Sequence, residues 1–247
     1  MTRTEQPADR APACWGGLLR RNAPALAGIV VATLAVDFLA YALSRPLSPS
    51  AHATVTLLTG LLWIILAVPV LAASGGSWLE GLFRGGIVAD ASLVVLLVLG
   101  LTGPAFTVPG AVAAYLLWAA VTLAMCALVL LARRAPVRQV LAVVAAVLVL
   151  AIAAGPFWVN GLLLAAEGPA RETAIRVTLE LNPVLATLGT MPPEFAPVWN
   201  EQPILYEHTV LGRDVSMLTV PWYVTAILYA GLALVFGSAA LLRRREQ

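Results

Sequence analysis

Six stretches of about 20 apolar residues dominate the chain, and an α-helix of this length crosses the hydrocarbon core of a bilayer. Hydrophobic residues make up 60% of the sequence and charged residues 11%, whereas soluble domains are roughly 45–50% apolar and about 25% charged. The sequence therefore predicts an all-α, polytopic membrane helix bundle. We expect spans near Ala23–Leu43, Val55–Ala73, Ile87–Gly103, Pro109–Ala132, Val140–Ala166 and Val220–Leu242.

The distribution of arginine orients this bundle. All 15 basic residues are arginine, and 11 of them fall in the two tails and the loops on the same side, against 4 on the other side. Because basic residues gather in cytoplasmic loops, both termini are predicted to be cytoplasmic. The lack of lysine and the abundance of Ala, Leu, Val and Gly indicate a GC-rich bacterial gene, hence a bacterial cytoplasmic membrane.

The chain divides into four parts in this interpretation. Residues 1–22 form an amphipathic cytoplasmic lead-in, and residues 23–166 hold spans one to five with an interfacial helix at 77–84. Residues 167–219 form an acidic extracytoplasmic cap, and residues 220–247 combine the last span with an Arg-rich cytoplasmic tail. As an alternative, the run from Arg20 to Ala42 also fits a cleaved signal peptide.

The cap carries seven acids against three arginines, and it contains several local signals. The alternation over Ile175–Leu181 is typical of a half-buried strand. Asn182-Pro183 predicts an N-cap and a first-turn proline for a short helix that ends at Gly189. Further prolines predict irregular structure for residues 190–219. Just before the cap, Gly155-Pro156 predicts a break in the fifth span.

Asp37 is the costliest residue to place in a membrane, because a carboxylate within a span costs a few kcal/mol. Thr33, Asp37 and Tyr41 follow at intervals of four residues, which places them on one face of the first helix. They are expected either to line a substrate or proton path or to join helices by hydrogen bonds. Asn160, beyond the break in span five, either caps freed backbone groups or faces a cavity. Asp90 is expected in the first turn of span three, where the helix dipole favours negative charge.

The sequence contains no catalytic constellation. Without lysine the chain lacks the residue needed for a Walker A phosphate loop, a Schiff base or a Ser-x-x-Lys acylase. His52 and His208 are the only histidines, and two imidazoles without a third ligand make a weak metal site. We expect no enzyme activity, no metal and no other cofactor. A membrane enzyme that uses the two histidines is the least favoured class.

The inner loop between spans two and three places residues 77–84 between two pairs of glycines. Ser77 is expected to cap a short helix with one apolar stripe, which the glycines allow to lie parallel to the membrane. This helix either anchors in lipid or docks a cytoplasmic partner. The residues expected at its surface are Trp78, Leu79, Glu80, Leu82, Phe83 and Arg84.

Two short motifs, Leu181-Asn182-Pro183-Val184 after span five and Pro221-Trp222-Tyr223 before the last span, accompany this six-span layout. With the lead-in, the inner helix and the outer cap, they resemble the permease subunits of type-2 ATP-binding-cassette exporters. The resemblance covers the topology of the whole chain but only a few residue identities. The chain departs from that family at the inner helix, where Glu80 and Arg84 replace a longer charged stretch.

The resemblance implies a dimerising transport permease that takes its energy from a separate ATPase. The partners it implies are a cytoplasmic ATPase subunit, a second permease copy or homologue, and membrane lipid, with no nucleic acid. Residues 77–84 would then transmit motion, and the stripe around Asp37 would face the pathway. The alternative function is a non-transporting anchor or scaffold subunit whose acidic cap docks an extracytoplasmic partner.

Overall fold

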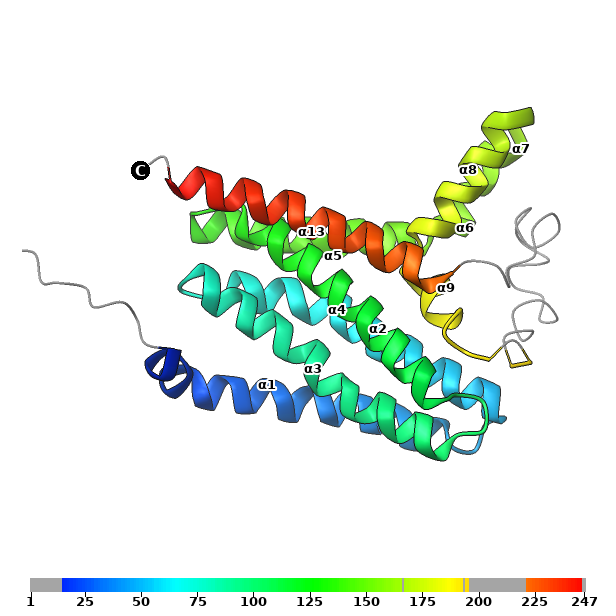
Figure 1. The fold of residues 1–247 in the computed structure, drawn as a ribbon, viewed down its shortest axis with the longest axis horizontal. Helices are drawn as coiled ribbons and strands as arrows, with labels where there is room; N and C mark the ends of the chain where they lie inside the picture. The colour runs from blue at the N-terminus through cyan, green and yellow to red at the C-terminus, as the bar shows by residue number, and fades with distance from the viewer. Residues whose placement is uncertain (1–14, 166, 193, 196–220, 246–247) are drawn as a thin grey trace, which may run out of the picture.

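The computed structural model describes residues 15–165, 167–192, 194–195 and 221–245, and its regular structure there is entirely helical (Figure 1). Six helices are long and apolar enough to cross a membrane, which confirms the predicted membrane helix bundle. The helices are α1 (Trp15–Ser44), α2 (Pro49–Ala73), α3 (Trp78–Thr102), α4 (Val108–Leu130), α5 (Ala135–Ala153), α6 (Gly155–Trp158), α7 (Asn160–Ala165), α8 (Gly168–Leu181), α9 (Pro183–Leu188) and α13 (Trp222–Arg245).

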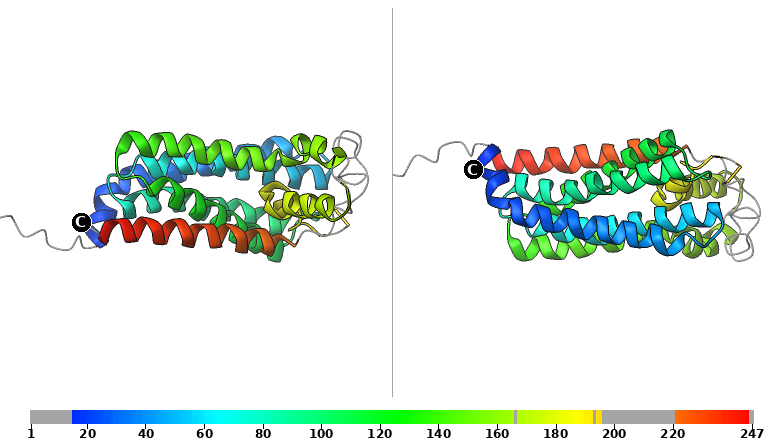
Figure 2. Two further views of the ribbon diagram at one scale, coloured as in Figure 1. Left: turned by 90° about the horizontal axis from the view of Figure 1, so that it is seen from above. Right: turned by 90° about the horizontal axis from the view of Figure 1, so that it is seen from below.

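The six long helices run side by side along the longest axis of the molecule (Figures 1 and 2). Helices α2 and α4 occupy the centre, since each contacts four of the other long helices. Helix α1 begins and α13 ends at the same end of the bundle, which we call the inner end, and the opposite end is the outer end. The assignment of the inner end to the cytoplasm rests on the arginine distribution.

Side-chain caps set where three of the spans begin. Ser48, Ser77 and Thr107 precede α2, α3 and α4, and each accepts a hydrogen bond from the backbone N–H three residues further on. Prolines stand in the first turns of α2, α4 and α5, where a missing N–H costs nothing. Between the caps, the helices make most of their backbone hydrogen bonds within themselves, as lipid requires, and Pro24 in α1 and Pro69 in α2 each remove one.

Small residues let the central helices approach closely, which matters because van der Waals packing is a main attraction between helices in lipid. A Cβ atom at Gly60 of α2 would lie 2.8 Å from the ring of Trp118 in α4. A Cβ atom at Gly85 of α3 would collide with the Cys126 sulfur of α4. Glycine at these two positions therefore sets the distance between the helices.

Two predicted boundaries near the inner end are wrong. Residues 77–84 do not form a separate interfacial helix, because α3 continues without a break from Trp78 to Thr102. Gly85 serves the close contact with Cys126 and does not turn the chain. As a consequence, Asp90 lies in the middle of α3 and not in its first turn.

The lead-in is likewise continuous with a span. Helix α1 already begins at Trp15, and its first turns lie at an angle to the rest of the helix (Figures 1 and 2). Pro24 lies inside α1, where its ring removes one backbone hydrogen bond. The side chains of residues 15–21 lie outside the described part, so their amphipathic character stays a prediction.

The cap contains a helix where a strand was predicted. Residues Ile175–Leu181 form the second half of α8, and the described residues contain no strand with which they could pair. A helix closes its own hydrogen bonds, and Arg176 adds an ion pair of 2.7 Å with Glu180 one turn later. The predicted break is present, since α5 ends at Ala153 and α6 begins at Gly155. Most of the predicted irregular stretch, from residue 196 on, lies outside the described residues.

We expect Gly60→Val to destabilise the fold by about 1–3 kcal/mol, because the new side chain overpacks against the buried indole of Trp118. Gly28→Val is the matched control, since a Cβ at Gly28 meets no atom within 4 Å. Thermal unfolding in detergent can be followed by thiol labelling of the buried Cys126 in a Cys14→Ser background. Equal unfolding midpoints for the two variants would contradict the contact between Gly60 and Trp118.

Candidate functional site: polar side chains between α1, α2 and α3

Polar side chains line the contact between α1, α2 and α3 from the outer end to the middle of the bundle. Thr33 and Asp37 are buried there and Tyr41 is half-buried, so these three residues face neighbouring helices. We call the whole set the polar seam. It comprises Thr33, Asp37, Tyr41 and Ser44 of α1, His52, Thr56 and Trp63 of α2, and Ser92 and Thr102 of α3.

Hydrogen bonds connect the outer part of the seam. The Ser44 hydroxyl lies 2.8 Å from Nδ1 of His52 and 3.3 Å from the Thr56 hydroxyl. The Tyr41 hydroxyl lies 3.0 Å from the Thr102 hydroxyl, and the Tyr41 ring meets the His52 ring edge-on at 4.8 Å. These contacts join α1 to both α2 and α3.

Asp37 occupies the middle of the seam without a comparable set of partners. Its side chain is 2% exposed, and Ser92, which lies beside it, is completely buried. Within the described residues, neither Asp37 oxygen nor the Ser92 hydroxyl makes a hydrogen bond of ordinary geometry. The two side chains line a cavity of about 10 Å³ together with Thr56, Gly60, Val95, Leu96 and Trp118. One turn further in, Thr33 accepts a hydrogen bond of 3.1 Å from the Trp63 indole.

A second polar cluster surrounds the turn between α2 and α3 at the inner end. Arg84 donates to the Ser74 carbonyl at 3.2 Å, to the Ser74 hydroxyl at 3.0 Å and to the Asn22 side chain of α1 at 3.0 Å. It also pairs with Glu80 at 2.5 Å. Glu80 in turn accepts from the Gly76 N–H, while its own N–H donates to Ser77, an arrangement close to a capping box.

Arg138, in the first turn of α5, also binds the α2–α3 turn. It is 8% exposed, and it donates to the Ala132 carbonyl at 2.9 Å and to the Gly75 carbonyl at 2.8 Å. The α2–α3 turn is thereby linked to α1 through Arg84 and to the α4–α5 turn through Arg138. We call these two arginines the inner clamp. The sequence marked Arg138 only as one of several inner arginines, since its burial depends on where the α2–α3 turn lies.

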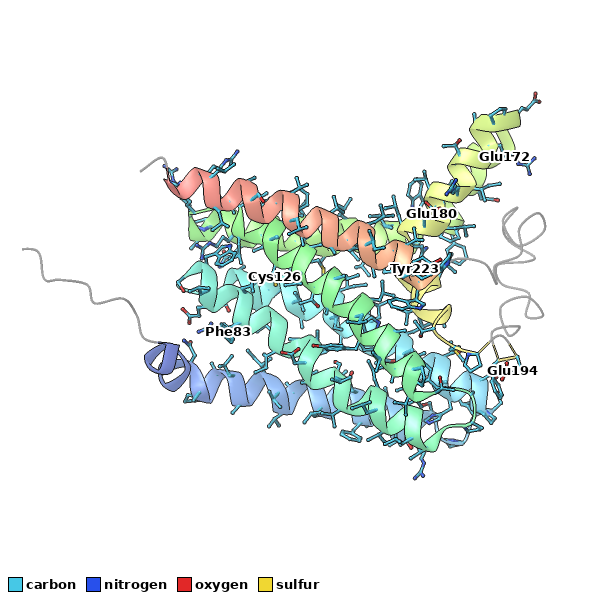
Figure 3. All side chains as sticks on the ribbon, viewed as in Figure 1. Phe83, Cys126, Glu172, Glu180, Glu194 and Tyr223 are labelled. Atoms are coloured by element: carbon cyan, nitrogen blue, oxygen red, sulfur yellow. The ribbon has the colours of Figure 1, made fainter. Side chains whose placement is uncertain are left out.

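The apolar residues predicted for partner docking divide between core and surface. Trp78 and Leu82 pack partly buried against the core, while Leu79 is 38% exposed. Figure 3 shows Phe83 at the inner end, close to the start of α1. The figure also shows Glu172 and Glu180 on α8 at the outer end, where they belong to the acidic cap.

Asn182 caps two helices at once. Its side-chain oxygen accepts from the backbone N–H groups of Val184 and Leu185 at the start of α9, as predicted for an N-cap. Its amide nitrogen donates to the carbonyls of Ile152 and Ala153, which the end of α5 leaves unpaired. This double role explains why Asn182 is completely buried.

Helix α9 is anchored deep in the bundle. Thr187 of α9 accepts a hydrogen bond of 3.1 Å from the Trp118 indole, about three turns into α4. Pro183, Ala186 and Leu188 are buried as well, and α9 contacts α2, α4, α5 and α13. The short helix α9 therefore lies between the outer ends of the spans.

Asp90 has the opposite environment to Asp37. It is exposed on the side of α3 near the middle of the span, and it accepts a hydrogen bond of 2.8 Å from Tyr115 of α4. A carboxylate on a lipid-facing surface at this depth is costly. This contact was not predictable from the sequence, because only the pairing of α3 with α4 brings the two residues together.

The remaining candidates lie apart from the polar seam. Asn160 begins α7, which projects with α6 and α8 beyond the outer end and has these two helices as its neighbours (Figure 1). His208 lies outside the described residues, so its pairing with His52 is untested. Among the residues that the structure describes, no three His, Cys, Asp or Glu side chains come together as metal ligands would.

Comparison with family models, with curated proteins and with solved structures gives no match for this chain. Its function must therefore be argued from its own contacts. Two features stand out: the polar seam around Asp37 and the inner clamp around the α2–α3 turn.

We expect Asn182→Ala to destabilise the protein by about 1–3 kcal/mol, because it leaves buried backbone groups of α5 and α9 unpaired. Asn182→Ser retains an acceptor for α9 and removes both donors to α5, so its effect should be intermediate. Unfolding midpoints in detergent measure the series. A serine variant as stable as the wild type would show that the donors to Ile152 and Ala153 contribute nothing.

Arg138→Met should also destabilise the protein by about 1–3 kcal/mol, because two turn carbonyls lose a charged donor. Arg133→Met removes the same charge from an exposed neighbouring position and should change stability by less than about 0.5 kcal/mol. Denaturation of both variants in the same detergent makes the comparison. Equal losses would mean that charge, and not the contact with the turn, is responsible.

Proposed function

We propose that this chain is the permease subunit of an ATP-binding-cassette type transporter in a bacterial cytoplasmic membrane, energised by a separate ATPase. The observation that carries the proposal is the inner clamp. Arg84 and Arg138 each bind a carbonyl of the α2–α3 turn, and they connect this turn to α1 and to the start of α5. A force applied to this turn by a cytoplasmic partner would move several spans together.

The surface beside the turn has the chemistry of a docking site. Leu79 is exposed in the first turn of α3, next to the Glu80–Arg84 ion pair. A combination of an apolar side chain with fixed charges is suited to recognition of a protein partner, because the apolar group supplies contact area and the charges supply orientation. Because α3 is continuous, a movement of its first turn would be transmitted along the helix to the middle of the membrane. A separate interfacial helix would lack this direct connection.

The cargo would pass along a face of the bundle, between two permease chains. Large side chains such as Leu61, Leu117 and Trp118 fill the centre of the described bundle and are at most 2% exposed. The exposed Asp90 and its partner Tyr115 favour the α3–α4 face as the side that a second copy or homologue covers. An apolar groove of about 450 Å³ between α1 and α2, near Gly28 and Trp63, suits contact with a lipid chain.

A non-transporting anchor subunit is the second candidate. The well-packed centre and the exposed Asp90 favour it as well, because both are compatible with a bundle that only holds a neighbouring membrane protein. The two functions differ at the inner end, where only the permease requires a cytoplasmic ATPase.

Leu79→Asp should reduce binding of the ATPase by about tenfold or more, because a carboxylate in an apolar contact costs at least about 1.4 kcal/mol. Leu101→Asp is the matched control, since Leu101 is exposed on the same helix at the outer end. The tagged protein is purified from its native membranes in mild detergent, and the copurifying ATPase is quantified by mass spectrometry.

Three outcomes are informative. The permease and the docking site are supported if the ATPase copurifies stoichiometrically with the wild type and with Leu101→Asp but is lost with Leu79→Asp. ATPase that persists with Leu79→Asp contradicts the docking site. A wild type that brings down no ATPase but a reproducible membrane or extracytoplasmic partner contradicts the permease and favours the anchor.

A further inference from the structure

A small cavity lies beside Asp37, among α1, α2, α3 and α4. Three polar side chains, Asp37, Thr56 and Ser92, reach it from three different helices, and each of them is at most 4% exposed. Its volume of about 10 Å³ is close to the minimum of about 10–15 Å³ that one water molecule requires. A water molecule there would depend on these three side chains for the polar partners that a buried water needs.

In the described part of the chain, no basic side chain lines the Asp37 cavity. Arg45 stacks on the Tyr41 ring at the outer end of the seam, 5.8 Å from the ring centroid, and does not line the cavity. The titratable groups on the outer and middle turns of the four surrounding helices are Tyr41 on α1, His52 on α2, Asp90 on α3 and Tyr115 on α4. Tyr115 is bound to Asp90 on the exposed side of α3, so neither serves Asp37. A buried ionised carboxylate without partners is far more costly than the neutral acid.

A chain of side chains connects this cavity to the outer end. Thr56 both lines the cavity and lies 3.3 Å from the Ser44 hydroxyl, which lies 2.8 Å from Nδ1 of His52. The Ser44 hydroxyl also donates to the Ala40 carbonyl at 2.7 Å, and the Thr56 hydroxyl donates to the His52 backbone carbonyl at 2.9 Å. With both hydroxyl protons in these bonds, Nδ1 of His52 carries a proton and donates to Ser44, and a proton passes between Ser44 and Thr56 once either hydroxyl rotates toward the other. His52 itself is partly exposed, close to the outer end of α2.

We propose that Asp37 is a proton-binding site that exchanges its proton with the outer solution through Thr56, Ser44 and His52. A proton enters at the His52 imidazole, and each hydroxyl then accepts one proton and releases another along the chain. A water molecule in the cavity passes it from Thr56 to an Asp37 oxygen, which turns a carboxylate into a neutral acid. The net change is one positive charge taken into the bundle, and no other reactant is consumed.

The proposal does not depend on the permease function. It rests on the cavity, the burial of Asp37 and the chain of hydroxyl groups, and each of these would also be present in an anchor subunit. Its tests therefore require neither an ATPase nor a cargo.

Infrared spectroscopy of the purified full-length protein in D2O tests the proton directly. At pH 5 we expect the C=O stretching band of a protonated carboxylic acid, which disappears in Asp37→Asn and remains in Asp90→Asn. Asp37→Asn resembles the neutral acid in shape, so we expect it to fold. Ser92→Ala is a second variant, which should shift the frequency of the band because it changes the surroundings of the acid. A wild type without a band that depends on Asp37 overturns the proposal.

The route is tested in lipid vesicles after a rise in the external pH. The band should decay reversibly in the wild type, and Thr56→Val should slow its decay by about tenfold, since one link of the chain is lost. Thr54→Val on the same helix is the matched control and should leave the rate unchanged. Equal rates for Thr56→Val and the wild type overturn the route.

The same measurement distinguishes a proton from a metal cation. Replacement of KCl by NaCl should leave the band of the wild type unchanged. Loss of the band in NaCl would show that sodium displaces the proton, and would overturn the assignment of the site to a proton in favour of a sodium site.

Discussion

Every polar group in the hydrocarbon region must find its partner inside the protein, because lipid supplies none. This constraint explains why the spans are helical and why their turns carry the polar side chains. Asn182 shows the effect most clearly, since one amide satisfies the open ends of both α5 and α9. At the inner end, Arg84 and Arg138 meet the same requirement for the carbonyls of the α2–α3 turn.

The two carboxylates in the middle of the spans meet this constraint in different ways. Asp90 lies on the surface and takes a hydrogen bond from Tyr115, which leaves it available to a neighbouring membrane protein. Asp37 is buried where α1 meets α2, α3 and α4, with the Ser92 hydroxyl beside it and no basic side chain lining its cavity, so burial disfavours its charged form. The first arrangement is suited to assembly, and the second to the exchange of a proton.

Trp118 connects the Asp37 cavity to the short helix α9. Trp118 of α4 touches Gly60 of α2, borders the Asp37 cavity and donates to Thr187 of α9. Any displacement of α4 would therefore reach both the polar seam and the short helix that the cap sends into the bundle. The inner clamp binds α1, α2, α3 and α5 at the opposite end of the bundle.

The sequence by itself determined the six spans, the break at Gly155-Pro156 and the cap at Asn182, because span length, proline and capping act locally. It also placed Thr33, Asp37 and Tyr41 on one face of α1. It misassigned Ile175–Leu181, because alternation does not reveal whether a strand partner exists. Only the tertiary structure decided that α3 is continuous, that Arg138 is buried and that Asp37 meets Ser92. In a membrane helix the apolar residues cover every face, so hydropathy does not tell which face meets lipid and which meets protein.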